Sequence, residues 1–454
     1  MDLRKELRWI AEAQNKQLPW NERYADEKIP PLVEKVQSDY DNGRFNFAKF
    51  IEHKVPQGDK KRKVKTYSAL SIEALLSIYL HRKLKWKFRV EFPNRNTYIR
   101  SLFDTVCALK DMSDYTVYKF DFANFFESVS SVYVFRRYIQ DRGLERYQED
   151  LLEKYVTETE YAYAGLCVSN VICEIAARRF DDLLRQSCVG KGLIYYRRYI
   201  DDGILIFNRC LTAAACEDLV QKAIDKAFYD GADTLCKTAL KKEKTRYIAR
   251  RDLNDGSAKA FDFLGYEFSL SGKKEKQKER TIVTYGITAE KREKYKAKIT
   301  EIMEKHRGKS DSRDLELLRH QLRAFSHRTV YMDVRKKQTI WINKGFLANY
   351  HELGNHLEQL SDETRDFLQN VIYDEAEKVF EKIPYFLKDS KNTYSTYSLY
   401  NNLRRNKALV FVERIGISHQ KLQAMCEEVG IDPNFSKKYD TLLRAYLNKV
   451  GVGY

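Results

Sequence analysis

The chain has 454 residues, a mass of 53.7 kDa and a formal net charge of +16, with 43% hydrophobic and 32% charged residues. This composition excludes a disordered chain, which would be poorer in apolar residues, and a helical membrane protein, which would need uncharged runs of about 18 residues. The excess of cations, together with 31 Tyr and 24 Phe, favours a nucleic-acid partner, because cations neutralise phosphates and aromatic rings stack on bases.

The first segments of the chain are predicted to be a helical region, a strand pair and a long helix. Residues 1–50 have a mixed helical pattern, and the first of them lack the apolar core of a signal peptide. We therefore expect a cytoplasmic protein without a membrane partner. Residues 51–68 indicate two strands around a basic turn, and residues 69–90 indicate a helix.

The rest of the chain divides into a mixed part and a helical part. Residues 192–207 form two apolar arms around Asp-Asp-Gly, which is a strong hairpin signal. Residues 211–229 indicate a helix, residues 261–270 a strand, and the charged run 273–280 a solvated hairpin tip. Residues 287–454 mix charged residues with Leu, Ile and aromatic residues, and we expect this part to be almost wholly α-helical.

Three carboxylates follow apolar strands in a way that suits a metal site. One strand ends in Asp121, and Asp201 and Asp202 occupy the hairpin tip. Adjacent carboxylates repel each other, which is hard to explain by stability and easy to explain by cation binding. Two Mg²⁺ ions, or Mn²⁺ in their place, can activate a 3′-hydroxyl and stabilise a leaving pyrophosphate. Asp121 and Asp201 would bridge the ions, Asp202 would flank them, and the backbone carbonyl of Phe122 could complete the shell; Asp-Asp-Gly alone is more often a solvated turn.

The order of motifs around these carboxylates resembles that of reverse transcriptases. Tyr-Ile-Asp-Asp at residues 199–202 lies between apolar strands, and an Asp-aromatic segment precedes it by 80 residues. Phe92-Pro-Asn-Arg-Asn and the later Asp-Phe-x-Asn-Phe-Phe-Glu-Ser resemble the bacterial defence-associated, abortive-infection reverse transcriptases. The resemblance covers roughly residues 50–300 and implies an RNA-directed DNA polymerase, a nucleotidyltransferase of the bacterial cytoplasm that acts against phage.

The same resemblance assigns roles to further residues. The nucleotide-binding positions of the family correspond to Lys54, Arg62, Phe126 and Ser169, its catalytic lysine to Lys244, and its primer grip to Leu264, Gly265 and Tyr266. The ring of Phe126 would lie under the sugar of the incoming nucleotide and clash with a 2′-hydroxyl, so the enzyme would select dNTPs. The alternative for Phe126 is an ordinary core residue.

One motif departs from the family pattern. Relatives have Gly-x-Pro-Gln-Gly on the template side, followed by three residues and Ser, whereas this chain has Tyr163-Ala164-Gly165 and then Ser169. The missing glutamine contacts the templating base pair in relatives. Its absence makes untemplated or protein-directed DNA synthesis an alternative to copying an RNA.

We therefore predict an α+β fold with the right-hand layout of a polymerase. It would have an N-terminal helical segment at 1–50, fingers and palm at 51–285, and an α-helical thumb and α-helical C-terminal extension at 286–454. The expected partners are dNTPs, an RNA template such as a noncoding RNA, the DNA product, further copies of the chain, and a protein from the same operon. The primer would be a 3′-hydroxyl or a protein hydroxyl. The alternatives are a retron-type enzyme, an RNA-copying RNA polymerase, which Phe126 disfavours, and a nucleic-acid-sensing scaffold with an inactive palm.

Overall fold

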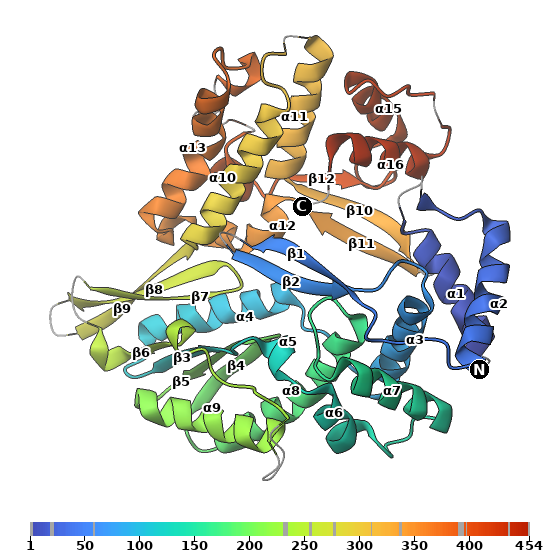
Figure 1. The fold of residues 1–454 in the computed structure, drawn as a ribbon. Helices are drawn as coiled ribbons and strands as arrows, with labels where there is room; N and C mark the ends of the chain where they lie inside the picture. Colours follow the sequence, from blue (N-terminus) through green and yellow to red (C-terminus); the bar gives the residue numbers. More distant parts are fainter. Residues whose placement is uncertain are drawn as a thin grey trace. The chain divides into compact units, whose positions relative to one another are not determined.

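The computed structural model describes residues 3–18, 22–57, 60–229, 235–253, 257–275, 278–309, 311–335, 338–388, 395, 397–434 and 436–452. The chain forms two compact units, Met1–Tyr98 with Met112–Asp252, and Ile99–Asp111 with Leu253–Tyr454. Each unit combines helices and strands, which confirms the predicted α+β class (Figure 1). Among the described residues, no helix has the length and apolar character needed to span a lipid bilayer.

The first unit contains two sheets and the helices that cover them. Its helices are α1 (Leu3–Asn15), α2 (Ile29–Asp41), α3 (Ile72–Lys87), α5 (Phe125–Ser128), α6 (Ser131–Val134), α7 (Arg146–Thr159), α8 (Cys167–Ser187) and α9 (Ala213–Phe228). Its strands are β1 (Ile51–Gln57), β2 (Lys60–Thr66), β3 (Thr116–Asp121), β4 (Leu193–Tyr199), β5 (Asp202–Phe207) and β6 (Arg246–Ala249). β1 and β2 form a hairpin, and the other sheet has the antiparallel order β4-β5-β3-β6. The predicted strand pair, the helix after it and the Asp-Asp-Gly hairpin are thus confirmed.

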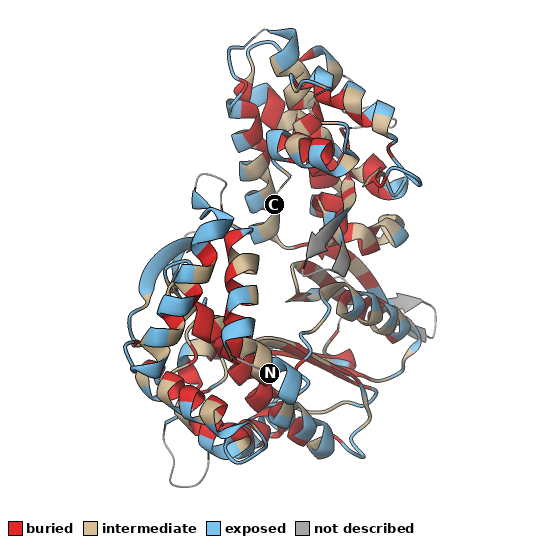
Figure 2. Ribbon diagram, turned by 90° about the vertical axis from the view of Figure 1, so that its right-hand side faces the viewer, coloured by how far each residue is buried: buried red, intermediate tan, exposed pale blue. Residues whose placement is uncertain are grey.

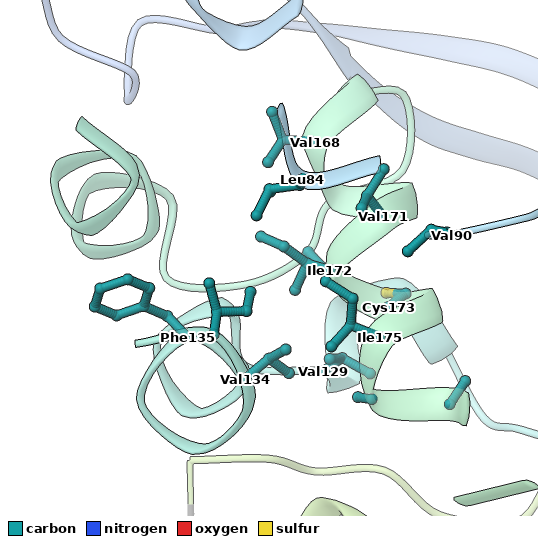
Figure 3. Close-up of a cluster of buried hydrophobic side chains, with 14 of the residues drawn as sticks. Leu84, Val90, Val129, Val134, Phe135, Val168, Val171, Ile172, Cys173 and Ile175 are labelled. Carbon is teal, nitrogen blue, oxygen red and sulfur yellow. The ribbon is translucent and has the colours of Figure 1, made fainter. Parts of the chain in front are cut away.

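Helix α8 is at the centre of the core of the first unit. Val168, Val171, Ile172 and Ile175 recur at helical spacing and are all buried. Figure 3 shows these side chains beside Leu84 of α3 and beside the segment that precedes and includes α6. Figure 2 shows the same pattern in ribbon form, with buried residues on the inner faces of helices and exposed residues on the outer faces. This core fixes α8 as the support for the sheet.

The second unit also combines helices with two sheets. Helix α4 (Arg95–Ala108) begins in the first unit and ends in the second. The strands are β7 (Ala258–Phe263), β8 (Tyr266–Glu275), β9 (Lys278–Ile287), β10 (Arg328–Arg335), β11 (Gln338–Lys344) and β12 (Ala408–Phe411). The helices are α10 (Ala289–Glu304), α11 (Ser312–Ser326), α12 (Phe346–Tyr350), α13 (Asp362–Val379), α14 (Leu399–Arg404), α15 (His419–Glu428) and α16 (Tyr439–Val450). The sheet orders are β7-β8-β9 and β11-β10-β12.

The prediction of an almost wholly helical C-terminal part is wrong. β10 and β11 pair as an antiparallel hairpin, and β12 joins β10 in parallel from far along the chain. The residues from 328 to 344 are rich in β-branched and aromatic side chains, which favour strands. Tyr331 packs against a core built with Leu409 and Phe411, so a pairing distant in sequence stabilises the sheet.

The units also divide the chain at a different place from the predicted domain boundary near 285. Residues 261–270 are not one strand but parts of β7 and β8, joined by a tight turn. β9 is joined to the helices that follow it: the backbone N–H of Ile287, its last residue, donates to Thr364 Oγ1 on α13 at 3.0 Å. The aromatic core of this sheet includes Phe103 of α4, whose ring stacks on Tyr285 at 4.7 Å. The three strands therefore belong to the second unit.

Candidate metal and nucleotide site

The sheet β4-β5-β3-β6 separates an apolar face from a charged face. Side chains alternate along a strand, so Phe120 and Lys119 point to opposite sides of β3. Phe120 packs against the ring of Phe180 on α8, with centroids 6.0 Å apart. Phe122, just beyond the strand, contacts Phe180 at 5.2 Å and Phe228 of α9 at 6.1 Å. These rings anchor β3 on α8 and α9, the helices labelled near it in Figure 1. By strand alternation, Lys119 and Asp121 lie on the other face.

The three predicted carboxylates meet at one end of this sheet. Asp121, the last residue of β3, lies directly opposite Asp202, the first residue of β5. The backbone N–H of Phe122 donates to the carbonyl oxygen of Asp201 at 3.0 Å, which ties the end of β3 to the hairpin turn. Burial raises the pKa of Asp201, and the neighbouring charge of Asp121 raises it further. The hairpin and the Asp121 strand therefore form one acidic cluster.

Two lysines compensate part of this negative charge. Lys244 Nζ lies 3.1 Å from Asp121 Oδ2, and Lys119 Nζ lies 3.0 Å from Asp202 Oδ1. Burial by itself lowers the pKa of Lys244, but the charges of Asp121 and the other two carboxylates raise it above its usual value. Lys244 is thus held protonated at the cluster, as its predicted role requires. Its side chain is 52% exposed, which leaves it accessible to a substrate.

The donor set of this cluster suits a hard divalent cation. Mg²⁺ prefers oxygen ligands and binds through one or two carboxylates together with substrate phosphates. The structure places Asp121, Asp201 and Asp202 at the same end of the sheet. Burial, and after it the charge of Asp121, raises the pKa of Asp201, and a bound cation would offset both effects. Asp121 and Asp201 could supply such ligands, and their role in holding ions remains a prediction.

Arg62 and Phe126 lie beside this cluster. The guanidinium carbon of Arg62, on β2, lies 5.7 Å from the centroid of the Phe126 ring, and its charge lowers the pKa of Asp201. Phe126 is half-buried on α5, and its ring contacts Phe125 edge to face at 6.0 Å. Lys54 is different: its partner in the hairpin is Lys63, so strand alternation directs its side chain to the face opposite Arg62. Arg62 therefore lies at the site, and Lys54 lies on the other face of the hairpin.

The loop that replaces the usual Pro-Gln motif rests on β2. The backbone N–H of Lys65 donates to the carbonyl of Ala164 at 2.8 Å, and the Lys65 ammonium lies 3.0 Å from the Tyr163 ring centroid and 4.1 Å from that of Phe50. Ser169 does not reach this surface. It is 0% exposed and lies beside Tyr155, which argues against its predicted contact with the nucleotide.

The predicted primer-grip residues form the turn between β7 and β8 in the second unit. Leu264 and Gly265 both have positive φ, +53° and +84°, which is typical of the two-residue turn of a tight hairpin. Tyr266 is buried, and its hydroxyl donates to the backbone carbonyl of Asn349 at 2.7 Å. Its side chain is therefore not available to a primer, and only Leu264 and Gly265 are at the tip.

The sequence reasoning missed Lys119 as a member of the site. Lys119 is 3% exposed, and it lies two positions before Asp121 on the same face of β3. A single lysine within an otherwise apolar strand is the signal that could have identified it, because a buried ammonium needs a carboxylate partner. Asp202 supplies that partner, so the negative charge of Asp202 is partly neutralised by Lys119. The position of Asp202 beside the metal ions remains a prediction.

Replacing Gly203 should disturb this site through its packing. Gly203 lies opposite Phe120, and an added Cβ would overlap the Phe120 ring. We expect Gly203→Ala to destabilise the protein by about 1–3 kcal/mol, the usual cost of overpacking a core. Chemical denaturation would measure the loss, and Phe120→Leu should recover part of it only in the Gly203→Ala background. Equal stabilities of Gly203→Ala and wild type would contradict this account.

Comparisons with known proteins give only distant similarities. No protein-family model matches the chain, and no curated protein matches it. It is similar to apo telomerase from Candida tropicalis truncated from the C-terminal domain, at 13% identity and a TM-score of 0.32, covering 51% of this chain and 57% of that one. It is also similar to telomerase from Candida albicans in complex with a fragment of telomeric RNA, at 10% identity and a TM-score of 0.36, covering 92% and 70%. The chain thus spans little more than half of the first structure, and similarities of this size define neither a family nor an activity.

Proposed function

We propose that this chain is a reverse-transcriptase-type DNA polymerase. The observation that carries the proposal is the convergence of Asp121 with the Asp201-Asp202 turn, where Asp121 lies directly opposite Asp202 and its charge adds to the effect of burial in raising the pKa of Asp201. Two bound Mg²⁺ ions would supply charge stabilisation for the attacking and leaving oxygens. In the reaction, the primer hydroxyl loses its proton and attacks the α-phosphate of a dNTP, and pyrophosphate leaves.

The surrounding residues have separate roles in this proposal. Asp121 and Asp201 hold the ions, and Lys119 fixes the orientation of Asp202. Lys244 is protonated and half-exposed, so it can donate a proton to the departing pyrophosphate. Arg62 can bind the triphosphate from the hairpin side, and Phe126 can pack against the sugar. Each of these roles uses a side chain within the first unit.

Nucleotide incorporation by the purified full chain tests the proposal. The protein would be supplied with Mg²⁺, labelled dNTPs and an RNA template carrying a DNA primer, and the products would be separated by length. We expect primer extension that needs both Mg²⁺ and Asp201. Failure of the wild-type protein to incorporate nucleotides on any primer would instead favour the alternative of a nucleic-acid-sensing scaffold.

A second candidate is DNA synthesis without an RNA template. It is favoured by the loop in which Tyr163 and Ala164 replace the usual Pro-Gln pair. There the Lys65 ammonium contacts the rings of Phe50 and Tyr163. Comparing products made by enzyme treated with RNase and by untreated enzyme would separate the two candidates. Products of the same sequence in both reactions would favour untemplated or protein-directed synthesis.

The wider biological role that we propose rests on the sequence resemblance. We propose antiphage defence in the bacterial cytoplasm, a noncoding RNA as template, assembly of several copies of the chain, and a partner protein from the same operon. Two measurements would test this role. One is sequencing of the nucleic acid that co-purifies with the chain, and the other is phage resistance of cells that produce the wild-type protein or Asp201→Asn.

A further inference from the structure

The turn that carries Asp201 contains a residue in an unfavourable backbone conformation. Ile200 has a φ of +60°, in the left-handed region that a β-branched residue rarely adopts. Such a conformation is strained and persists only where its surroundings impose it. The carboxylate of the next residue, Asp201, depends on this turn for its position. Something in the structure must therefore hold Ile200.

Arg198 contacts this turn directly from the apolar side of the sheet. Its side chain is buried, and Nη1 donates to the carbonyl oxygen of Ile200 at 2.8 Å. The same guanidinium group donates from Nε and Nη2 to Asp181 at 2.9 and 3.0 Å, and from Nη1 and Nη2 to Glu174 at 3.3 and 2.8 Å. All five N–H donors of the guanidinium group are thereby used.

The two carboxylates that hold Arg198 belong to helix α8. Glu174 and Asp181 are two helical turns apart on one face of α8, which is fixed by the apolar core of the first unit. Asp181 also accepts a hydrogen bond from the hydroxyl of Tyr196 at 2.5 Å. The turn at Ile200 is therefore connected through one buried guanidinium group to a helix packed into the apolar core.

We propose that Arg198 is a positioning residue for the candidate metal site. It holds Ile200 in its left-handed conformation and so sets where the Asp201 carboxylate lies, without contacting the ions or the substrate. The identity of the ions rests on the proposed function, whereas the restraint on the turn rests on the Arg198 contacts alone. A lysine could not replace this arginine, because a single ammonium group cannot span both carboxylates and the carbonyl.

Mn²⁺ binding and hydrogen exchange on the full chain test this role. Mn²⁺ titration followed by electron paramagnetic resonance should show at least tenfold weaker binding in Arg198→Lys than in wild type, with faster amide exchange at residues 199–203. Arg178→Lys is the matched control. Arg178 is on α8, between Glu174 and Asp181, and its guanidinium group donates to the carbonyls of Phe88 and Arg89, both at 2.6 Å, away from the turn. We expect this control to bind Mn²⁺ as wild type does.

A double variant separates positioning from general destabilisation. Glycine adopts positive φ at little cost, so Ile200→Gly removes the strain that Arg198 counters. In the Ile200→Gly background, Arg198→Lys should weaken Mn²⁺ binding by no more than about threefold. In the wild-type background the same substitution should weaken it by at least tenfold, which corresponds to about 1.4 kcal/mol. A purely structural role would give the same loss in both backgrounds.

Several results would overturn the inference. One is a folded Arg198→Lys protein with the Mn²⁺ affinity and the amide hydrogen exchange of wild type. Another is a loss of Mn²⁺ affinity in Arg178→Lys equal to the loss in Arg198→Lys. If Arg198→Lys does not fold, Glu174→Gln removes one acceptor of the guanidinium group and should weaken Mn²⁺ binding by about two- to fivefold; unchanged binding would overturn the inference. Wild-type Mn²⁺ binding without nucleotide incorporation would remove only the proposed polymerase, whereas absence of Asp201-dependent Mn²⁺ binding would remove both.

Discussion

Asp201→Asn is expected to reduce nucleotide incorporation by at least about a thousandfold. Neutralising a carboxylate that holds the ions removes several kcal/mol of charge stabilisation from the transition state, and about 4 kcal/mol corresponds to a thousandfold in rate. Steady-state primer extension at saturating Mg²⁺ would measure the effect. Asp218→Asn is a suitable control, because Asp218 forms an exposed ion pair with Lys222 on α9, and it should leave the rate unchanged. Activity of Asp201→Asn within tenfold of wild type would contradict the assignment of the site.

The same substitution should stabilise the metal-free protein. Burial and the Asp121 charge raise the pKa of Asp201 in the folded state, so the folded state binds this proton more tightly than the unfolded state does. Folding stability is therefore lost as the pH rises through the raised pKa, and an uncharged asparagine avoids that loss. In EDTA near pH 7.5, we expect the Tm of Asp201→Asn to rise by roughly 2–4 °C, as about 1 kcal/mol would produce. This gain in Tm should shrink as the pH falls. Asp202→Asn should instead lower the Tm, because this substitution removes the carboxylate partner of the buried Lys119 ammonium.

Phe126→Ala is expected to admit ribonucleotides. If the ring lies under the sugar, its removal leaves space for the 2′-hydroxyl, and the preference for dNTPs over rNTPs should fall by roughly tenfold to a hundredfold, the range of about 1–3 kcal/mol for a small steric difference. Competition between dNTPs and rNTPs in primer extension would measure the ratio of the two kcat/KM values.

Phe125→Leu is the control for this substitution. Phe125 is buried and stacks on Phe122 at 5.0 Å, so its replacement should lower stability and leave sugar selection unchanged. The half-exposed position of Phe126 beside Arg62 makes it accessible, which a core residue would not be. If sugar selectivity is the same in Phe126→Ala and wild type, Phe126 is a packing residue and the selection lies elsewhere.

Local signals in the sequence account for the elements that carry the site. The Asp-Gly turn between apolar arms predicts the hairpin β4-β5, and the apolar segment ending in Asp121 predicts β3. In the C-terminal part, β10 and β11 were missed although their β-branched and aromatic residues are a local strand signal. β12 pairs with β10 across a long separation, and such pairing leaves no local signal. Similarly, the burial of Ser169 and Tyr266 follows from packing around them and not from their motifs.

The sequence by itself determined which residues could supply carboxylates and where the strands that present them end, because strand and turn preferences act over a few neighbouring residues. Only the tertiary structure decided that Asp121 lies opposite Asp202 and that Lys119 and Lys244 neutralise part of the cluster. It also decided that Arg62, on the hairpin face opposite Lys54, lies beside Phe126. These relations depend on strand register and on contacts between segments far apart in the chain. The physical reason is that charge interactions fall off with distance, so the chemistry of a carboxylate depends on neighbours that folding alone brings near.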